Sequence, residues 1–332
     1  MQWRIYLQRV FCGVLVCFLI YIIVFRRRSQ RVFLTESDIY EYTNEKYSNH
    51  KQLHRIPRII HQTWKTTDVP VYWNATVESV RKSNAHRFKY LIWTDDDMHD
   101  FVRQEYPYLY RHTFLKYPLN IQRVDAFRYL VLYRMGGIYI DMDNGCRRSF
   151  DSLLDVLEAM DPEVNHTAAF PRTSPIGISN GFMITTKGHP LFKILVSRLP
   201  HFNRDFLVDY LTVMLSAGPL YLSVNEFYFN QISHQSIIRI IDENVYSSIY
   251  TWHTPGNSWH GRDARIILQI YHTWRRKPRV ILYCFLLIIT LIILGLLCFR
   301  RNKRCCNLRF SSTRKILLPR KFNYSRIKPV PI

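Results

Sequence analysis

The chain has 332 residues, seven cysteines and a formal net charge of +21 at pH 7. Such a charge is common in proteins that bind nucleic acid, but here the basic residues gather beside two apolar runs and after the second one. We therefore expect contact with anionic lipid headgroups, or a solvated basic tail, and no nucleic-acid partner. Only Cys146 lies between the apolar runs, so no disulfide can form within that region.

The two apolar runs, residues 10–25 and 280–299, predict transmembrane helices. Residues 1–9 are then a short cytosolic tail, and residues 300–332, basic and without acidic residues, a second one. The charges around the first run favour the opposite orientation. A cleaved signal peptide is the alternative for that run, although no clear small-x-small site follows it.

Two glycosylation sequons, at Asn74 and Asn165, favour a lumenal location for the region between the spans. Within this region, residues 26–55 are polar and predict a stem. The domain proper is expected at residues 56–263, followed by a membrane-proximal helix at 264–279 that can lie in the interface.

The domain begins with a short strand at Ile59-Ile60, which ends near Trp64. A helix is expected from Asn74 to Ser83 and a second strand from Phe88 to Trp93. The acidic run at residues 95–97 suits the start of the next helix, where carboxylates cap backbone N–H groups.

The central stretch, residues 123–146, reads RVDAFRYLVLYRMGGIYIDMDNGC. Asp125 and Arg128 lie three residues apart and so share one face of a predicted helix. Gly136-Gly137 ends this helix, because glycine accepts the left-handed conformation of a C-cap. Residues 138–140 are typical of a buried strand.

Asp141 and Asp143 follow this strand and, in extended chain, point to the same side. Two carboxylates there form a cradle of hard oxygen ligands for Mg²⁺ or Mn²⁺, and the metal can hold a diphosphate. A solvated turn is the alternative interpretation of an isolated Asp-x-Asp.

The remaining elements alternate in the same way and predict an open α/β sheet with ligands at the carboxyl edge of its strands. Helices are expected at 151–159, 189–199, 206–215 and 218–229, and strands at 168–170 and 237–241. Asn180 opens a further strand, either as a ligand-binding amide or as a turn former. Residues 252–260 form a loop rich in Trp, His and Ser.

The patterns Arg123-x-Asp125-x-x-Arg128-Tyr129 and Gly136-Gly137-x-Tyr139-x-Asp141-x-Asp143 resemble glycosyltransferase family 32. The resemblance implies a GT-A type nucleotide-sugar transferase domain that retains the anomeric configuration and uses Mn²⁺ or Mg²⁺. It gives catalytic roles to Asp125, Arg128, Asp141 and Asp143, with the last two as metal ligands.

The resemblance also places donor-binding residues at Trp64, Tyr139, Asn180 and Trp259. It gives the loop at 252–260 a residue that completes the metal shell, for which His253, Ser258 and His260 are all candidates. Trp64 as a core residue, and the loop as a membrane-proximal aromatic segment, remain open.

Residues 56–262 are most similar to fungal inositol phosphoceramide mannosyltransferases. This implies GDP-mannose as donor, inositol phosphoceramide as acceptor and a multi-pass Golgi membrane protein with a lumenal catalytic domain; a regulatory membrane subunit is a further partner to consider. The competing interpretations are a glycan-extending mannosyltransferase, a glycolipid galactosyltransferase, and a non-catalytic sugar-nucleotide-binding subunit.

Overall fold

The computed structural model describes residues 32–43, 54–173, 177–206, 208–232, 236–254, 256 and 261–276. The predicted spans, both tails and residues 257–260 lie outside the described residues. Within the described part, no helix is long and apolar enough to cross a membrane. The chain divides into two units, residues 1–268 and 269–332, and the fold below is that of the first.

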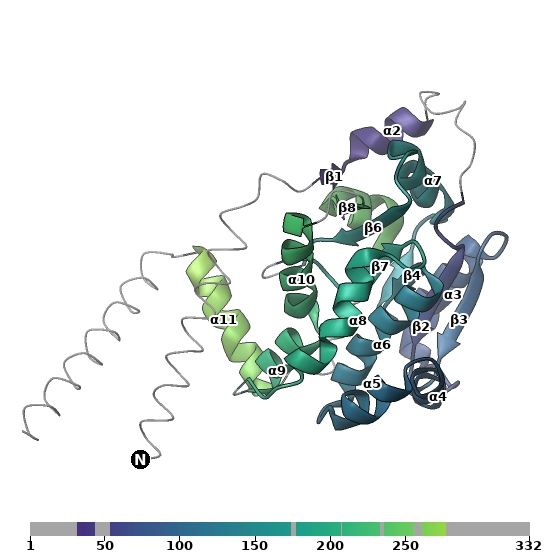
Figure 1. Cartoon of the computed structure of the whole chain (residues 1–332). Coiled ribbons are helices and arrows are strands. Elements are labelled where there is room, and N and C mark those ends of the chain that lie inside the picture. Colours follow the sequence, from purple (N-terminus) through teal and green to yellow (C-terminus); the bar gives the residue numbers. More distant parts are fainter. Residues whose placement is uncertain are drawn as a thin grey trace, which may run out of the picture. The chain divides into compact units, whose positions relative to one another are not determined.

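A seven-stranded sheet forms the centre of this unit, in the order β1-β8-β6-β7-β4-β2-β3 (Figure 1). The strands are β1 Val32–Leu34, β2 Ile59–Thr63, β3 Lys89–Trp93, β4 Gly137–Ile140, β6 His166–Pro171, β7 Phe182–Thr185 and β8 Ser236–Ile241. The predicted open α/β sheet is confirmed. One strand, β7, runs antiparallel to both its neighbours, while the other pairs in the sheet are parallel.

Helices cover both faces of the sheet (Figure 1). The helices among the described residues are α2 Glu36–Thr43, α3 Asn74–Asn84, α4 Asp95–Glu105, α5 Pro107–His112, α6 Asn120–Met135, α7 Asp151–Met160, α8 Pro190–Phe202, α9 Asp209–Ser216, α10 Pro219–Ile232 and α11 Arg262–Arg276, the last of which continues beyond the first unit. Short 3-10 helices occur at η2 Val71–Trp73 and η3 Phe114–Lys116, and a π-helix at η4 Asn244–Tyr250.

Two hydrophobic cores lie on opposite faces of the sheet. On β4, Ile138 and Ile140 enter the core built with α7, whereas Tyr139 enters the core built with α6 and α8. This alternation is the two-residue period of a strand, and all three residues are fully buried. A strand buried on both faces needs an apolar sequence, which is why GIYI was recognisable as one.

The predicted stem at residues 26–55 is corrected in part. Residues 32–34 form β1, which pairs in parallel with β8, and residues 36–43 form α2, whose Ile39 is buried in the core that α7 shares. The chain therefore joins the folded domain at Val32. A three-residue strand at a sheet edge carries too little periodicity for the sequence to reveal it.

A second, two-stranded antiparallel sheet joins β5 Asn144–Cys146 to β9 Thr251–His253. The sequence predicted only a loop over residues 252–254. This ribbon begins directly after Asp143, so it brings the carboxyl-terminal part of the domain to the predicted metal ligands.

Candidate active site

The site begins where α6 turns back into β4. Gly136 and Gly137 have φ angles of 70° and 98°, a backbone conformation that favours glycine, and a Cβ on Gly137 would lie 2.4 Å from the carbonyl oxygen of Ile59. This tight reversal places the carboxyl end of β4 beside the amino-terminal half of α6. Residues 125 and 141, distant in sequence, therefore meet.

Arg128 is the centre of the resulting network. Its Nη2 lies 3.3 Å from Asp125 Oδ1 and 3.0 Å from Asp141 Oδ1. Its Nη1 donates to the backbone carbonyl of Asn180 at 3.0 Å, and the Asn180 side chain donates to Asp125 Oδ1 at 3.1 Å. Asp125, Arg128 and Asn180 are all at most 5% exposed, so their mutual geometry is fixed by packing.

Tyr139 holds the first aspartate of the Asp-x-Asp pair. Its hydroxyl donates to Asp141 Oδ1 at 3.0 Å and accepts from the Thr63 hydroxyl at 2.8 Å. The Arg128 guanidinium lies 4.8 Å from the centre of the Tyr139 ring. Tyr139 was predicted to bind the donor, but it is fully buried, so any effect on a donor passes through Asp141. Thr63 was missed by sequence reasoning; its place at the end of β2 was the available signal.

The second oxygen of Asp141 is left for another ligand. Among the described residues, Arg128 and Tyr139 both contact Oδ1, while Oδ2 lies against Gly181. A Cβ at Gly181 would come within 2.6 Å of Oδ2, so a side chain there would fill the space beside that oxygen. A hard divalent cation prefers such carboxylate oxygens, and the residues present fit one.

Asp143 is positioned by the β5–β9 ribbon. Its Oδ1 accepts from the Asn144 side chain at 2.8 Å, and its Oδ2 lies 3.1 Å from His253 Nε2. Its backbone carbonyl accepts from Thr254 N at 2.8 Å. Of the three residues proposed to complete a metal shell, His253 is therefore beside Asp143, whereas Ser258 and His260 lie outside the described residues. Trp259 lies there too.

Burial and an excess of carboxylates shape the electrostatics of the site. Burial raises the pKa of Asp125 to about 7 and that of Asp141 to about 6, and in both cases nearby Arg128 opposes the rise. Burial lowers the pKa of Arg128, but the neighbouring carboxylates outweigh it, and its pKa is above its ordinary value. The hydrogen bond to Asp143 raises the pKa of His253. Two carboxylates share one guanidinium and a third, that of Asp143, lies beside them, an imbalance that favours a bound cation.

An aromatic cluster borders the two aspartates. Met142, the residue between them, packs with Trp73 and Val77, and Trp64 and Tyr90 lie against this cluster. Trp64 is partly buried and close to the carboxyl end of β2. Stacking of Trp64 on a nucleotide base stays a prediction. Trp73 was not singled out from the sequence, although its position in a short polar-aromatic run was visible.

The two sequon asparagines are both accessible: Asn74 begins α3 and Asn165 immediately precedes β6, and each is exposed. Thr76 of the first sequon is buried and donates to the carbonyl oxygen of Met142 at 2.6 Å. Glycosylation of Asn74 and Asn165 stays a prediction.

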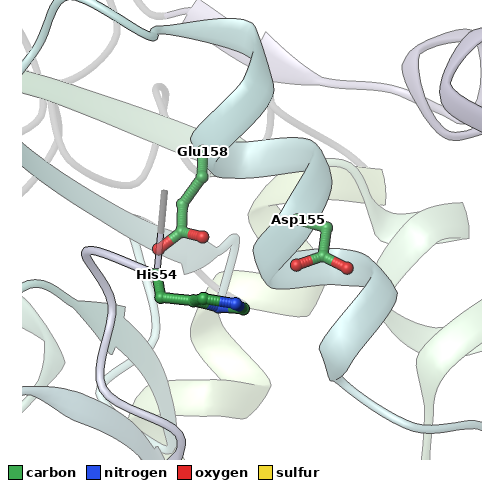
Figure 2. A group of neighbouring side chains, drawn as sticks. All are labelled: His54, Asp155 and Glu158. Carbon is green, nitrogen blue, oxygen red and sulfur yellow. The ribbon is translucent and has the colours of Figure 1, made fainter. Parts of the chain in front are cut away.

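A second acidic cluster lies at the opposite end of the strands, where β2 begins. Figure 2 shows His54 beside Asp155 and Glu158 of α7, and their ligand atoms lie within 4.8 Å of one another. It is the only group of three such side chains within that distance among the described residues. However, Arg58 already contacts Asp155 at 2.6 Å and Glu158 at 3.3 Å, so a cation there would compete with a guanidinium. We assign this cluster a structural role.

Comparison with known proteins identifies a family that matches the middle of the chain. A family described as "Glycosyltransferase sugar-binding region containing DXD motif" matches residues 70–158, which include α6, β4 and both aspartates. Among solved structures, the PaToxG glycosyltransferase is similar at 18% identity and a TM-score of 0.39, over 59% of this chain and 74% of that chain. That likeness is too distant to define the fold.

Curated relatives match most of the domain. Inositol phosphoceramide mannosyltransferase 1 of Schizosaccharomyces pombe is 33% identical over 76% of this chain and 77% of its own length. Inositol phosphoceramide mannosyltransferase 3 of the same yeast is 37% identical over 70% of this chain and 63% of its own. A mannosyl phosphorylinositol ceramide synthase of Saccharomyces cerevisiae is 36% identical over 64% of this chain and 54% of its own. The chain thus belongs to the DXD-motif glycosyltransferases of family 32, as its sequence predicted, and it is a glycosyltransferase.

Proposed function

We propose that this glycosyltransferase moves mannose from GDP-mannose to inositol phosphoceramide, with retention of configuration. Two relatives that cover most of the domain are named inositol phosphoceramide mannosyltransferases. The observation that carries the proposal is the complete network of Asp125, Arg128 and Asp141, with Asp143 beside it. A binding protein that had lost catalysis would have no need to keep these groups buried and mutually oriented.

Asp141 and Asp143 would hold a divalent cation, Mn²⁺ or Mg²⁺, with His253 beside Asp143 as the described candidate for a further ligand. When bound, such an ion neutralises charge on the departing diphosphate. Tyr139 and Arg128 contact one oxygen of the Asp141 carboxylate, so the other would be available to the ion. Trp64, and Trp259 in the loop, would contact the nucleotide.

Asp125 would accept hydrogen bonds from the donor sugar, and Asn180 would orient it. In the transfer, the bond between the anomeric carbon and the diphosphate oxygen breaks, and a bond to the acceptor hydroxyl forms on the same face. The hydroxyl proton passes to the leaving diphosphate. We name no side-chain nucleophile.

We further propose that the domain is lumenal in the Golgi, held by spans at residues 10–25 and 280–299. Exposure of Asn74 and Asn165 is compatible with glycan attachment in that compartment. A lipid acceptor suits this plan, because enzyme and substrate then share one membrane surface. A regulatory membrane subunit is compatible with it.

Lipid analysis of cells lacking the gene tests the proposal directly. We expect loss of mannosylinositol phosphoceramide and accumulation of inositol phosphoceramide, restored by the unmodified chain and not by Asp143→Asn. Unchanged sphingolipids with shortened mannose chains on glycoproteins would instead identify a glycan-extending enzyme.

Assays on the purified full chain identify the donor sugar and distinguish an enzyme from a binding subunit. We expect transfer from GDP-mannose to inositol phosphoceramide in mixed micelles, lost on chelation and restored by Mn²⁺ or Mg²⁺. Transfer from UDP-galactose would identify a galactosyltransferase. Metal-dependent binding of GDP-mannose without turnover, in a protein that restores no lipid in cells, would identify a non-catalytic subunit.

A further inference from the structure

The outer side of α5 and η3 carries an unusual combination of side chains. Tyr108, Arg111, His112, Leu115 and Lys116 are all exposed, with Tyr108 73% and Leu115 47% accessible. Leu109, Tyr110, Thr113 and Phe114, which alternate with them, are buried. The exposed set, which we call the α5 face, is therefore one continuous side of the segment.

The α5 face is positively charged and has no acidic neighbour in sequence. From Tyr106 to Val124 there is no Asp or Glu. Within the described residues, neither Arg111 nor Lys116 takes part in an ion pair. Aromatic and aliphatic side chains interleaved with unpaired basic ones suit the headgroup zone of an anionic bilayer, where rings and alkyl groups insert and cations meet phosphates.

This face is joined to the amino-terminal end of α6, the helix that carries Asp125 and Arg128. Tyr117, the residue after Lys116, accepts from Arg123 through its backbone carbonyl at 2.6 Å, and Arg123 lies two residues before Asp125. On the other side, the Asn203 side chain donates to the carbonyl oxygen of Thr113 at 3.5 Å, which joins η3 to the end of α8. Gln122 of α6 donates to Ser216 of α9 at 2.7 Å. The α5 face and α9 thus flank the same end of α6 (Figure 1).

α9 in turn packs against the start of α11, where Tyr210 N donates to Asp263 Oδ2 at 2.8 Å and Ala264 is fully buried. The α5 face therefore belongs to the same group of packed helices as α6, α9 and the start of α11.

We propose that the α5 face docks on an anionic lipid surface and turns the amino-terminal end of α6, which carries Asp125 and Arg128, toward the bilayer. This inference rests on the proposed function and deepens it, because a docked face would present the site to a membrane-embedded acceptor. Docking itself is measured without turnover, so it can fail while mannosyl transfer stands, and the reverse.

The test uses the full chain reconstituted into phosphatidylcholine vesicles with or without radiolabelled phosphatidylinositol. A photoreactive benzophenone side chain replaces Leu115, and in a matched protein it replaces Lys89. Lys89 is exposed at the amino end of β3, on the opposite edge of the sheet from the site. We expect a lipid adduct at position 115 in the anionic vesicles, and little at position 89.

Charge removal sharpens the same experiment. Each basic residue near an anionic surface contributes about fivefold to binding, so Arg111→Gln with Lys116→Gln should lower the adduct at position 115 by up to about 25-fold. Lys82→Gln with Lys89→Gln is the matched control and should leave it unchanged. Thermal midpoint and GDP-mannose binding establish that each variant is folded.

Equal adducts at positions 115 and 89, or no adduct at 115 in a folded and membrane-inserted protein, would overturn the proposal. Cross-linking of position 115 to a polypeptide in native membranes, in place of lipid, would also overturn it and identify a protein partner as the occupant. A lipid adduct that ignores the charge of residues 111 and 116 would refute the electrostatic docking proposed here.

Discussion

Two clusters of carboxylates and arginine lie at opposite ends of the parallel strands of the same sheet: one where the strands begin, the other where they end. Arg58 immediately precedes β2 and contacts Asp151, Asp155 and Glu158 of α7. Asp141 immediately follows β4, which is parallel to β2, and meets Arg128. Both clusters are largely buried and both attach an arginine to several acids, so composition alone does not tell them apart.

The two clusters differ in how many of their carboxylate oxygens have partners among the described residues. In the α7 cluster, Arg58 donates to three carboxylates, Arg87 adds an ion pair to Asp151, and the backbone N–H of Ile56 donates to Glu158 at 2.6 Å. In the active site, one guanidinium serves Asp125 and Asp141, and the Asp143 carboxylate hydrogen-bonds, among the described residues, only to Asn144 and an exposed histidine. A structural cluster closes on itself, whereas a binding site keeps oxygen atoms for its ligand.

The distinction between the two clusters is tested most strongly by removing one carboxylate from each. Asp143→Asn should lower turnover about a thousandfold or more, because stabilisation of a departing diphosphate is worth several kcal/mol. Asp155→Asn, the matched change, should keep turnover per folded molecule and lower only the thermal midpoint. Steady-state transfer and thermal unfolding measure both. If the two variants lose turnover equally, the distinction between the clusters is wrong.

Removal of Arg58 should lower the stability of the domain and leave its turnover unchanged. Arg58→Met leaves three acids without their main partner, and breaking a buried ion pair in this way costs about 3–5 kcal/mol of unfolding free energy. Turnover of the fraction that remains folded should not change. Lys82→Met is the control, since its ion pair with Glu78 is on the surface and contributes at most ~1 kcal/mol. A loss of turnover without loss of stability in Arg58→Met would contradict the assignment.

His61, in the middle of β2 between the two clusters, gives a pH-dependent test. Trp93 Nε1 can only donate, and it lies 3.1 Å from His61 Nδ1, so Nε2–H donates to the Gly136 carbonyl at 3.1 Å. Burial lowers the pKa of His61 from 6.5 to about 4. Between these values the unfolded chain binds a proton that the folded one does not, so stability falls as pH falls through this window.

The full contribution of His61 is about 3 kcal/mol, since one pKa unit corresponds to ~1.36 kcal/mol. His61→Gln keeps a donor and an acceptor but cannot titrate. We therefore expect a shallower loss of unfolding free energy between pH 6.5 and about 4 in this variant than in the unmodified chain. Parallel curves over that range would show that His61 is protonated in the folded state.

The smallest effects should come from Tyr139, which donates to Asp141, and from Thr63, which donates to Tyr139. Tyr139→Phe removes one of two hydrogen bonds to Asp141 Oδ1 and leaves Arg128, so turnover should fall about tenfold. Thr63→Val removes the donor to Tyr139 and should cost only about two- to threefold. Turnover measured over a Mn²⁺ titration checks both. An effect of Thr63→Val as large as that of Tyr139→Phe would mean that Thr63 contacts the ligand itself.

The sequence predicted the strand, the glycine turn and both aspartates because each leaves a local pattern. Asp125 and Arg128 share a helical face by spacing alone. Asn180 was named only through the family resemblance, and Thr63 was missed, because both reach the site through tertiary structure. His253 was one of three equal candidates in a loop, and only its pairing in β9 sets it beside Asp143. The early strand β1 is stabilised by β8, about 200 residues later.

The β5–β9 ribbon carries one further consequence, for the evolution of the chain. Gly145 lies opposite Trp252, and a Cβ there would come within 2.1 Å of the indole. Only glycine at position 145 therefore leaves room for this tryptophan, and only in the present alignment of the two strands. Insertion of one residue before Trp252 would move the indole opposite Asn144, where His253 now lies, and take His253 out of its present register beside Asp143. Insertions in the segment before β9 are thus a route by which a descendant could change the surroundings of Asp143 without a change in the seven-stranded sheet, to which this ribbon does not belong.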